Sequence, residues 1–347
     1  MEHPDTIRAM ANLAATHHYL RKYTEAEKLD MQVLDASKRI LGVEHPETIR
    51  AMGNLAAIYK HVGKYTEAKK LNIQVLDARN RILGVEHPDT IKTMANLAAI
   101  YHYLGKYTEA EKLEIQVLDA RNIILGVEHP DTINAMAHLA ATYHYLEKYI
   151  EAEKLNSQVL NASNRILGVE HPDTINAMAH LAVTYHYLEK YTEAEKLNIQ
   201  VLDASNRILG VEHPDTIRAM VNLAAAYKNL GKYTEAEKLN SQVLDARDRI
   251  LGVEHPDTIR AMVNLAAAYR NMGKYTEAEK LETQAQELKR RVPGAKSSHA
   301  ITTMANVQEA QEIQILDAGS TVPCRKNPRC LIWSIRRVIQ LPSYKAL

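Results

Sequence analysis

The motif GVEHPDTI recurs at a fixed interval and constrains the fold of this chain more than any other feature of the sequence. Its His-Pro pair begins at residues 3, 45, 87, 129, 171, 213 and 255, so that successive copies stand 42 residues apart. A period of 20–50 residues is the signature of a repeat architecture, in which each unit packs only against its neighbours. The sequence therefore predicts one elongated array, rather than the two globular domains that 347 residues would otherwise suggest.

Each unit has the pattern of two helices, and the second copy, residues 45–86, illustrates the first of them. Pro46 suits the first position of a helix, where its missing N–H costs nothing. Apolar residues then recur three or four positions apart, which places them on one face of a helix. They are Ile49, Met52, Leu55, Ala56 and Tyr59. Gly63 can adopt the positive φ that ends such a helix.

A second helix is predicted to follow within each unit. In most copies it opens with Thr-Glu-Ala-Glu, as at Thr24–Glu27, which has the spacing of a capping box. In residues 45–86 its buried face is predicted to consist of Ala68, Leu71, Val75, Ala78 and Ile82. Gly84 is predicted to end this helix, so GVEHPDTI marks the stop of one helix pair and the start of the next.

These patterns predict an all-α fold, an α-solenoid of about fourteen helices that form antiparallel pairs. The superhelix is expected to be right-handed or similarly curved, with a concave surface lined chiefly by the first helices. Residues 1–292 form the predicted solenoid. Residues 293–318 read as a degenerate eighth repeat that can act as a cap. Residues 319–347 read as a basic tail outside the repeat, either an amphipathic helix, a disordered segment or a spurious extension.

Composition narrows the classes of partner and compartment. The net charge is +1, and the tail 319–347 contains basic residues but no Asp or Glu, so the repeats are slightly acidic. Repeats with a slight negative charge are not expected to bind nucleic acid through their overall charge. The two cysteines, Cys324 and Cys330, lie in the tail, and repeats without cysteine fit a reducing, cytoplasmic setting. No apolar stretch reaches the length of a membrane helix, so no membrane partner is expected.

Catalysis is not expected from this sequence. It contains no phosphate-binding loop, no nucleophile elbow and no His-Glu-x-x-His motif, and a residue repeated seven times in equivalent loops is typical of a scaffold. The histidines of neighbouring repeats that could form a zinc site are His138, His144, His180 and His186. Their spacing of six residues within a repeat is unlike that of paired helical ligands, and no cysteine or carboxylate cluster joins them. No metal or cofactor is therefore expected.

The repeat resembles the tetratricopeptide repeat through Leu55, Ala56, Tyr59, the Gly63–Tyr65 turn and Ala68. Its longer unit, with Leu-Gly-x-x-His-Pro between helix pairs, looks like the repeats of kinesin light chains. It is also similar to arrays that follow NTPase modules in fungal and bacterial sensor proteins. The resemblance covers residues 1–292 and implies a non-catalytic interaction scaffold.

The resemblance also implies where a ligand binds. In such arrays, polar positions on the first helices line a groove that holds an extended peptide, and Asn side chains grip the peptide backbone. Variation between the copies here concentrates on these positions, with basic residues towards the ends and His and Tyr in the centre. The implied groove residues are Arg50, Asn54, Lys92, Asn96, His102, Tyr103, Asn134, His138, His144, Tyr145, Asn176, His180, His186, Tyr187, Arg218, Asn222 and Asn264. Basic ends favour an acidic ligand.

Three functions remain open at this point. The first is an adaptor, similar to a kinesin light chain, that holds a peptide or a partner helix in its groove. The second is a ligand-sensing array detached from an NTPase or effector module. The third is a structural array that self-associates through uncapped ends, because Met1 stands where Val43 stands one repeat later and leaves the first helix bare. The central histidines further suggest a grip that depends on pH between 5 and 7.

Overall fold

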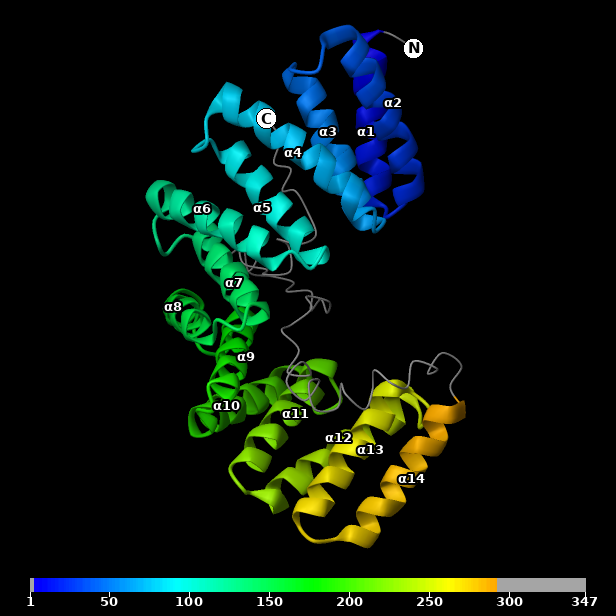
Figure 1. The fold of residues 1–347 in the computed structure, drawn as a ribbon, viewed down its shortest axis with the longest axis vertical. Coiled ribbons are helices and arrows are strands. Elements are labelled where there is room, and N and C mark those ends of the chain that lie inside the picture. The colour runs from blue at the N-terminus through cyan, green and yellow to red at the C-terminus, as the bar shows by residue number, and fades with distance from the viewer. Residues whose placement is uncertain (1–2, 292–347) are drawn as a thin grey trace. The chain divides into compact units, whose positions relative to one another are not determined.

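The computed structural model describes residues 3–291 and shows seven helix pairs in them (Figure 1). The first helices of the repeats are α1 (Pro4–Tyr19), α3 (Pro46–His61), α5 (Pro88–Tyr103), α7 (Pro130–Tyr145), α9 (Pro172–Tyr187), α11 (Pro214–Asn229) and α13 (Pro256–Asn271). The second helices are α2 (Tyr23–Leu41), α4 (Tyr65–Leu83), α6 (Tyr107–Leu125), α8 (Tyr149–Leu167), α10 (Tyr191–Leu209), α12 (Tyr233–Leu251) and α14 (Tyr275–Arg291). The predicted all-α solenoid is confirmed. The predicted degenerate repeat, the tail and both cysteines lie outside the described residues.

The helices belong to two compact units, Met1–Glu147 and Lys148–Leu347. In the first unit, each helix from α1 to α6 packs against the helix that follows it. In the second unit, the same holds for each helix from α8 to α13. Within each unit the contacts are therefore those of a solenoid, in which every repeat packs on the next.

The recurring motif forms the boundary between helix pairs, as predicted. Gly84 ends α4 with φ 86°, a conformation that glycine adopts without steric cost. His87 is the N-cap of α5, and its Nδ1 accepts a hydrogen bond from the backbone N–H of Asp89 at 3.2 Å. Pro88 follows at the first position of the helix. Because Nδ1 has to be unprotonated to accept, this motif uses histidine in its neutral form as a cap.

The apolar face predicted for the first helix is the core of each repeat. In α3, Ile49, Met52, Leu55 and Ala56 are at most 5% exposed, whereas Tyr59 is only half-buried and carries the ammonium group of Lys64 over its ring. The leucine equivalent to Leu55 is 3–4% exposed in the second to seventh repeats. In the first repeat the same residue, Leu13, is 48% exposed. Burial of this column therefore depends on the helix of a preceding repeat.

The predicted capping box is wrong. Helix α2 begins at Tyr23, one residue before the threonine, and its N-cap Lys22 makes no side-chain capping bond. Glu27, the expected partner of Thr24, instead forms an ion pair with Lys64 of the next repeat. The same pair recurs between Lys190 and Glu153 at 2.7 Å. The glutamate of the motif thus connects repeats, because a lysine ammonium group lies within its reach once the repeats are stacked.

The predicted burial of Ile82 is also wrong. Ala68, Val75 and Ala78 of α4 are buried, but Ile82 in its last turn is 50% exposed. Neighbouring Arg81 forms an ion pair at 2.9 Å with Glu44, which precedes the His-Pro pair of its own repeat. The last turn of the second helix therefore lies at the edge of the stack, where solvent reaches its apolar side chains.

A left-handed residue connects the two helices of each repeat and supports a stability prediction. Gly231 occupies it in the sixth repeat with φ 72°, whereas Glu189 occupies it in the fifth with φ 59°. A residue with a Cβ atom loses roughly 1–2 kcal/mol in this conformation, and part of that is offset by the extra freedom of an unfolded glycine. Glu189→Gly should raise the free energy of unfolding by about 1 kcal/mol, and Gly231→Glu should lower it by a similar amount. Urea denaturation followed by circular dichroism measures both; shifts of equal sign would contradict the argument.

Candidate functional site

One face of each first helix carries polar side chains four residues apart that pack outside the core. We name this face the polar stripe, and each helix contributes the two positions held in α3 by Arg50 and Asn54. In the first unit it further comprises Arg8, Asn12, Lys92, Asn96, Asn134 and His138. In the second unit it comprises Asn176, His180, Arg218, Asn222, Arg260 and Asn264. Residues four apart lie one above the other on a helix, so the two members contributed by each helix share one face.

The stripe is most open in α3 and α5. Arg50, Lys92 and Asn96 are exposed and Asn54 is half-buried, whereas Asn134 and Asn222 are buried. The residues between them are small, with Gly53 in α3 and Ala95 in α5. A Cβ atom placed on Gly53 would meet no atom within 4 Å, so the space above this helix is empty. The predicted groove residues of α3 and α5 therefore border an accessible surface.

The arginines of the stripe are largely neutralised within their own helix turn. Arg50 forms an ion pair with Glu47, three residues earlier. Arg218 does the same with Asp215 at 2.7 Å. In contrast, no carboxylate of residues 3–291 lies within ion-pair distance of Lys92. The free positive charge of the stripe therefore centres on α5 rather than on the ends that the sequence suggested.

The predicted tyrosines stack between consecutive repeats at the carboxyl ends of the first helices. Tyr103 lies flat on Tyr65 with ring centroids 4.8 Å apart. Tyr145 stacks on Tyr107 at 4.5 Å, and His102 meets both of these rings edge-on. Tyr187 likewise stacks on Tyr149 at 4.8 Å. These contacts give the aromatic column a packing role, because such ring pairs stabilise an interface beyond the area that they bury.

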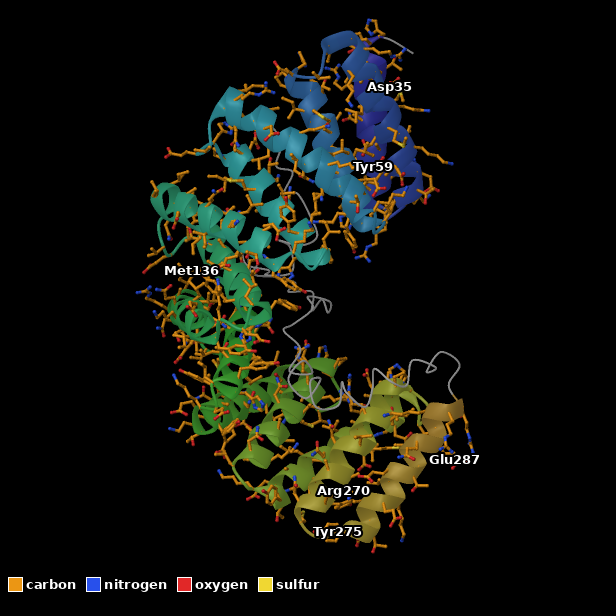
Figure 2. All side chains as sticks on the ribbon, in the orientation of Figure 1. Asp35, Tyr59, Met136, Arg270, Tyr275 and Glu287 are labelled. Carbon is orange, nitrogen blue, oxygen red and sulfur yellow. The ribbon has the colours of Figure 1, made fainter. Side chains whose placement is uncertain are left out.

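The sequence analysis missed the other half of this stack. Tyr65, Tyr107 and Tyr149 belong to the recurring turn before each second helix, which was interpreted only as a helix boundary. The signal was present, since tyrosine recurs in this turn in all seven repeats. Where Asn229 and Asn271 replace the stacking ring, the sixth and seventh repeats lack this contact. In the seventh repeat Arg270, labelled in Figure 2, forms an ion pair with Glu282 of α14 at 2.6 Å.

The pKa values of His138 and His144 lie below the range of pH 5–7 that a pH-dependent grip requires. Burial, helped by the charge of nearby Arg121, lowers the pKa of His138 to about 4. Burial alone lowers the pKa of His144 to about 4 and lowers that of His102 as well. His138 and His144 are therefore neutral throughout pH 5–7. The predicted pH-dependent grip between pH 5 and 7 is wrong for these two residues, because desolvation disfavours the charged imidazole.

The described residues show neither a metal-binding group nor a membrane span. Within residues 3–291, no three His, Cys, Asp or Glu side chains are arranged to hold an ion. His144 is buried, and the positive charge of Arg121 near His138 repels a cation. Among the helices that the structure describes, none combines the length and the apolar character needed to cross a bilayer.

Comparison with known proteins identifies the family. The tetratricopeptide-repeat profile matches residues 5–71, 52–123, 131–207, 180–233 and 215–291, which together span most of the chain. The chain belongs to the tetratricopeptide-repeat family. This fold is a general scaffold for protein interactions and is typically non-catalytic. No curated protein matches the sequence.

Solved structures with this tetratricopeptide architecture include kinesin-light-chain-like proteins. The chain is 31% identical to the nearly identical TPR-like repeats of a provisionally assigned kinesin light chain from Podosopora anserina, with a TM-score of 0.54 over 60% of this chain and 99% of that one. BtubC (BKLC) from P. vanneervenii is 18% identical, with a TM-score of 0.54 over 68% and 92% of the two chains.

A sensor protein shares the same fold. The signal transduction ATPase with a tetratricopeptide repeat sensor from Pyrococcus horikoshii has a TM-score of 0.65 at 14% identity. The match covers 89% of this chain and 44% of that protein. At this identity the similarity concerns the fold alone.

Proposed function

We propose that this tetratricopeptide-repeat protein is a non-catalytic adaptor that binds an extended acidic peptide on the polar stripe of α3 and α5. Among family roles, the adaptor function of a kinesin light chain fits best, since the chain shares 31% identity with a provisionally assigned member. The cytoplasm is the proposed compartment, because the repeats contain no cysteine.

The observation that carries this proposal is the open surface over α3 and α5. Asn54 and Asn96 offer amide groups that both donate and accept hydrogen bonds, as the backbone of an extended peptide requires. Gly53 and Ala95 between them leave room for that backbone to approach the helices closely. Glycine inside a helix costs about 1 kcal/mol relative to alanine, and nothing within the protein requires it at this position.

The charge of the stripe favours an acidic ligand. Lys92 is exposed and makes no ion pair within the described residues, so its ammonium group is available to a carboxylate of the ligand. Arg50 is also exposed, although Glu47 competes for its guanidinium group. Exposed charges of this kind steer association and discriminate between partners more than they add affinity. Binding should therefore weaken as salt rises.

A display library of random dodecapeptides provides the test. The wild-type chain is expected to enrich acidic peptides, and the double variant Lys92→Glu/Asn96→Ala should bind the enriched peptide at least tenfold more weakly in fluorescence anisotropy. The matched control Lys70→Glu/Gln74→Ala makes the same chemical changes at exposed positions of α4 and should bind as the wild type does. Equal affinity of the two double variants would place the ligand away from the polar stripe and refute the proposal.

A further inference from the structure

Seven apolar side chains lie exposed at the carboxyl ends of α4 and α6 and in the loops that follow them. We name this surface the apolar edge. It consists of Ile82, Leu83, Val85, Ile123, Ile124, Leu125 and Val127, which are 41–78% exposed. All seven belong to the first compact unit. They lie on the second helices and the loops, and are therefore separate from the polar stripe of the first helices.

The apolar edge has two groups of side chains: Ile82, Leu83 and Val85 at the end of α4, and the other four at the end of α6. Ion pairs in other repeats indicate that these two groups adjoin. Arg81 reaches Glu44 of the preceding repeat boundary at 2.9 Å, and Arg207 and Arg249 reach the equivalent glutamates Glu170 and Glu212 at 3.0 and 3.1 Å. The last turn of one second helix thus touches the loop that begins the repeat. In the third repeat this arginine is replaced by Ile123. Because Ile123 stands at the equivalent position, it is placed on the side of α6 that faces the loop of Val85 and Glu86, and the two groups adjoin there.

The isoleucine contributes little to the stability of the unit itself. Ile123 is 78% exposed, so most of its apolar surface remains in water. Its presence also leaves Glu86 without an ion pair among residues 3–291. The residue equivalent to Ile123 is arginine in all six other repeats, and in the second, fourth, fifth and sixth repeats that arginine places a charge between the apolar groups. Contiguous exposed apolar surface of this kind marks a site of protein association.

We propose that two copies of this chain associate through the apolar edge, each presenting the same surface to the other about a twofold axis. A twofold interface requires a patch that complements itself, and seven uncharged branched side chains satisfy this condition. None of them carries a charge that would select a different partner, and interfaces between identical subunits are the more apolar class. A specific interface buries about 800 Å² on each partner and consists of an apolar core within a polar rim; the seven side chains, each 41–78% exposed, supply such a core.

Sedimentation velocity and light scattering of the intact chain, from about 1 to 200 µM, test this proposal. The wild type is expected to form a dimer whose population rises with concentration. Ile123→Arg should weaken association at least tenfold, since it places a charge in the apolar edge and supplies a partner for Glu86. This variant restores the residue of the six sister repeats, so it should retain the helical circular dichroism and melting curve of the wild type.

Two control variants separate the apolar edge from other causes. Ile150→Thr removes an isoleucine that is 61% exposed elsewhere and restores the threonine of the sister repeats. Thr108→Arg adds the same charge as Ile123→Arg at an exposed position at the start of α6. Both controls should dimerise as the wild type does. A wild type that stays monomeric, or an Ile123→Arg variant that dimerises as strongly as the controls, would overturn the proposal.

Discussion

Leu97→Ala should lower the free energy of unfolding by about 3 kcal/mol, whereas Leu13→Ala should lower it by less than about 1 kcal/mol. The two leucines occupy the same position of the repeat, in α5 and α1 respectively. Leu97 is 3% exposed and Leu13 is 48% exposed. Removing a buried leucine costs both transfer free energy and a cavity, but a half-exposed leucine leaves no enclosed cavity.

Urea denaturation followed by circular dichroism measures this pair of variants. Hydrogen exchange at α5 and α1 then shows whether the loss is local, because a repeat array can open one unit at a time. The two alanine variants remove the same atoms from the same helical position, so each is the control for the other. Equal losses would mean that the helix packed on Leu97 contributes nothing to its burial, against the structure described above.

Glu114→Gln should stabilise the protein at pH 8 by on the order of 3 kcal/mol and change little near pH 4.5. Glu114 of α6 is 8% exposed and stands where four sister repeats have asparagine. Burial raises its pKa from 4.5 to about 7; the Thr142 hydroxyl opposes this shift and the charge of Glu111 adds to it. The folded state therefore holds the proton more tightly than the unfolded state does.

The direction of the pH dependence follows from that difference in proton binding. A carboxyl group whose pKa is raised by folding contributes its full stability below about pH 4.5, and this contribution is lost as pH rises to about 7. Glutamine has no proton to lose, so its advantage should grow over the same interval. Urea midpoints between pH 4.5 and 8 measure this. Glu86→Gln, at an exposed position of the first unit, serves as the control and should show no such trend. A constant difference between Glu114→Gln and the wild type at all pH values would contradict the raised pKa.

The helix pairs were predictable because their signals are local. The His-Pro start, the glycine stop and the three-or-four spacing of Ile49, Met52 and Leu55 act within a single helix or turn. The hydrogen bond that each requires is made inside the same turn, as at His87. Seven copies of the same local signal also make the repeat, and hence the order of packing, readable from the chain. These features agree with the structure for that reason.

Two of the errors concern what another repeat places, or does not place, against a residue. Glu27 was assigned to its own helix start, but the lysine that holds it belongs to the next repeat. Ile82 fits the apolar period of α4, yet the stack ends before it and no helix covers it. A helical period shows that residues share a face, but it contains no information on whether another helix lies against that face.

The candidate site likewise contains residues that one helix face identifies and contacts that were not predicted. The polar stripe at Arg50, Asn54, Lys92 and Asn96 was identified from variation on one helix face, and these side chains remain accessible. The tyrosines that the resemblance places in the same groove have a contact that was not predicted: Tyr103 and Tyr145 stack on rings of the preceding repeat, while each stays 46–47% exposed. The distribution of free charge was missed although its signal is local, since Arg50–Glu47 and Arg218–Asp215 are pairs three residues apart on one helix.

The amino-acid sequence alone thus determined the number of repeats, the position of each helix and most residues that face its core, because short-range sterics and hydrogen bonds specify them. Only the stacking of the repeats decided the exposure of Leu13, the pKa values of Glu114 and His138, the aromatic contacts and the apolar edge at Ile123. Each of these depends on whether a residue of another helix covers or contacts the side chain. Identical local sequences therefore acquire different properties according to what the neighbouring repeat places against them.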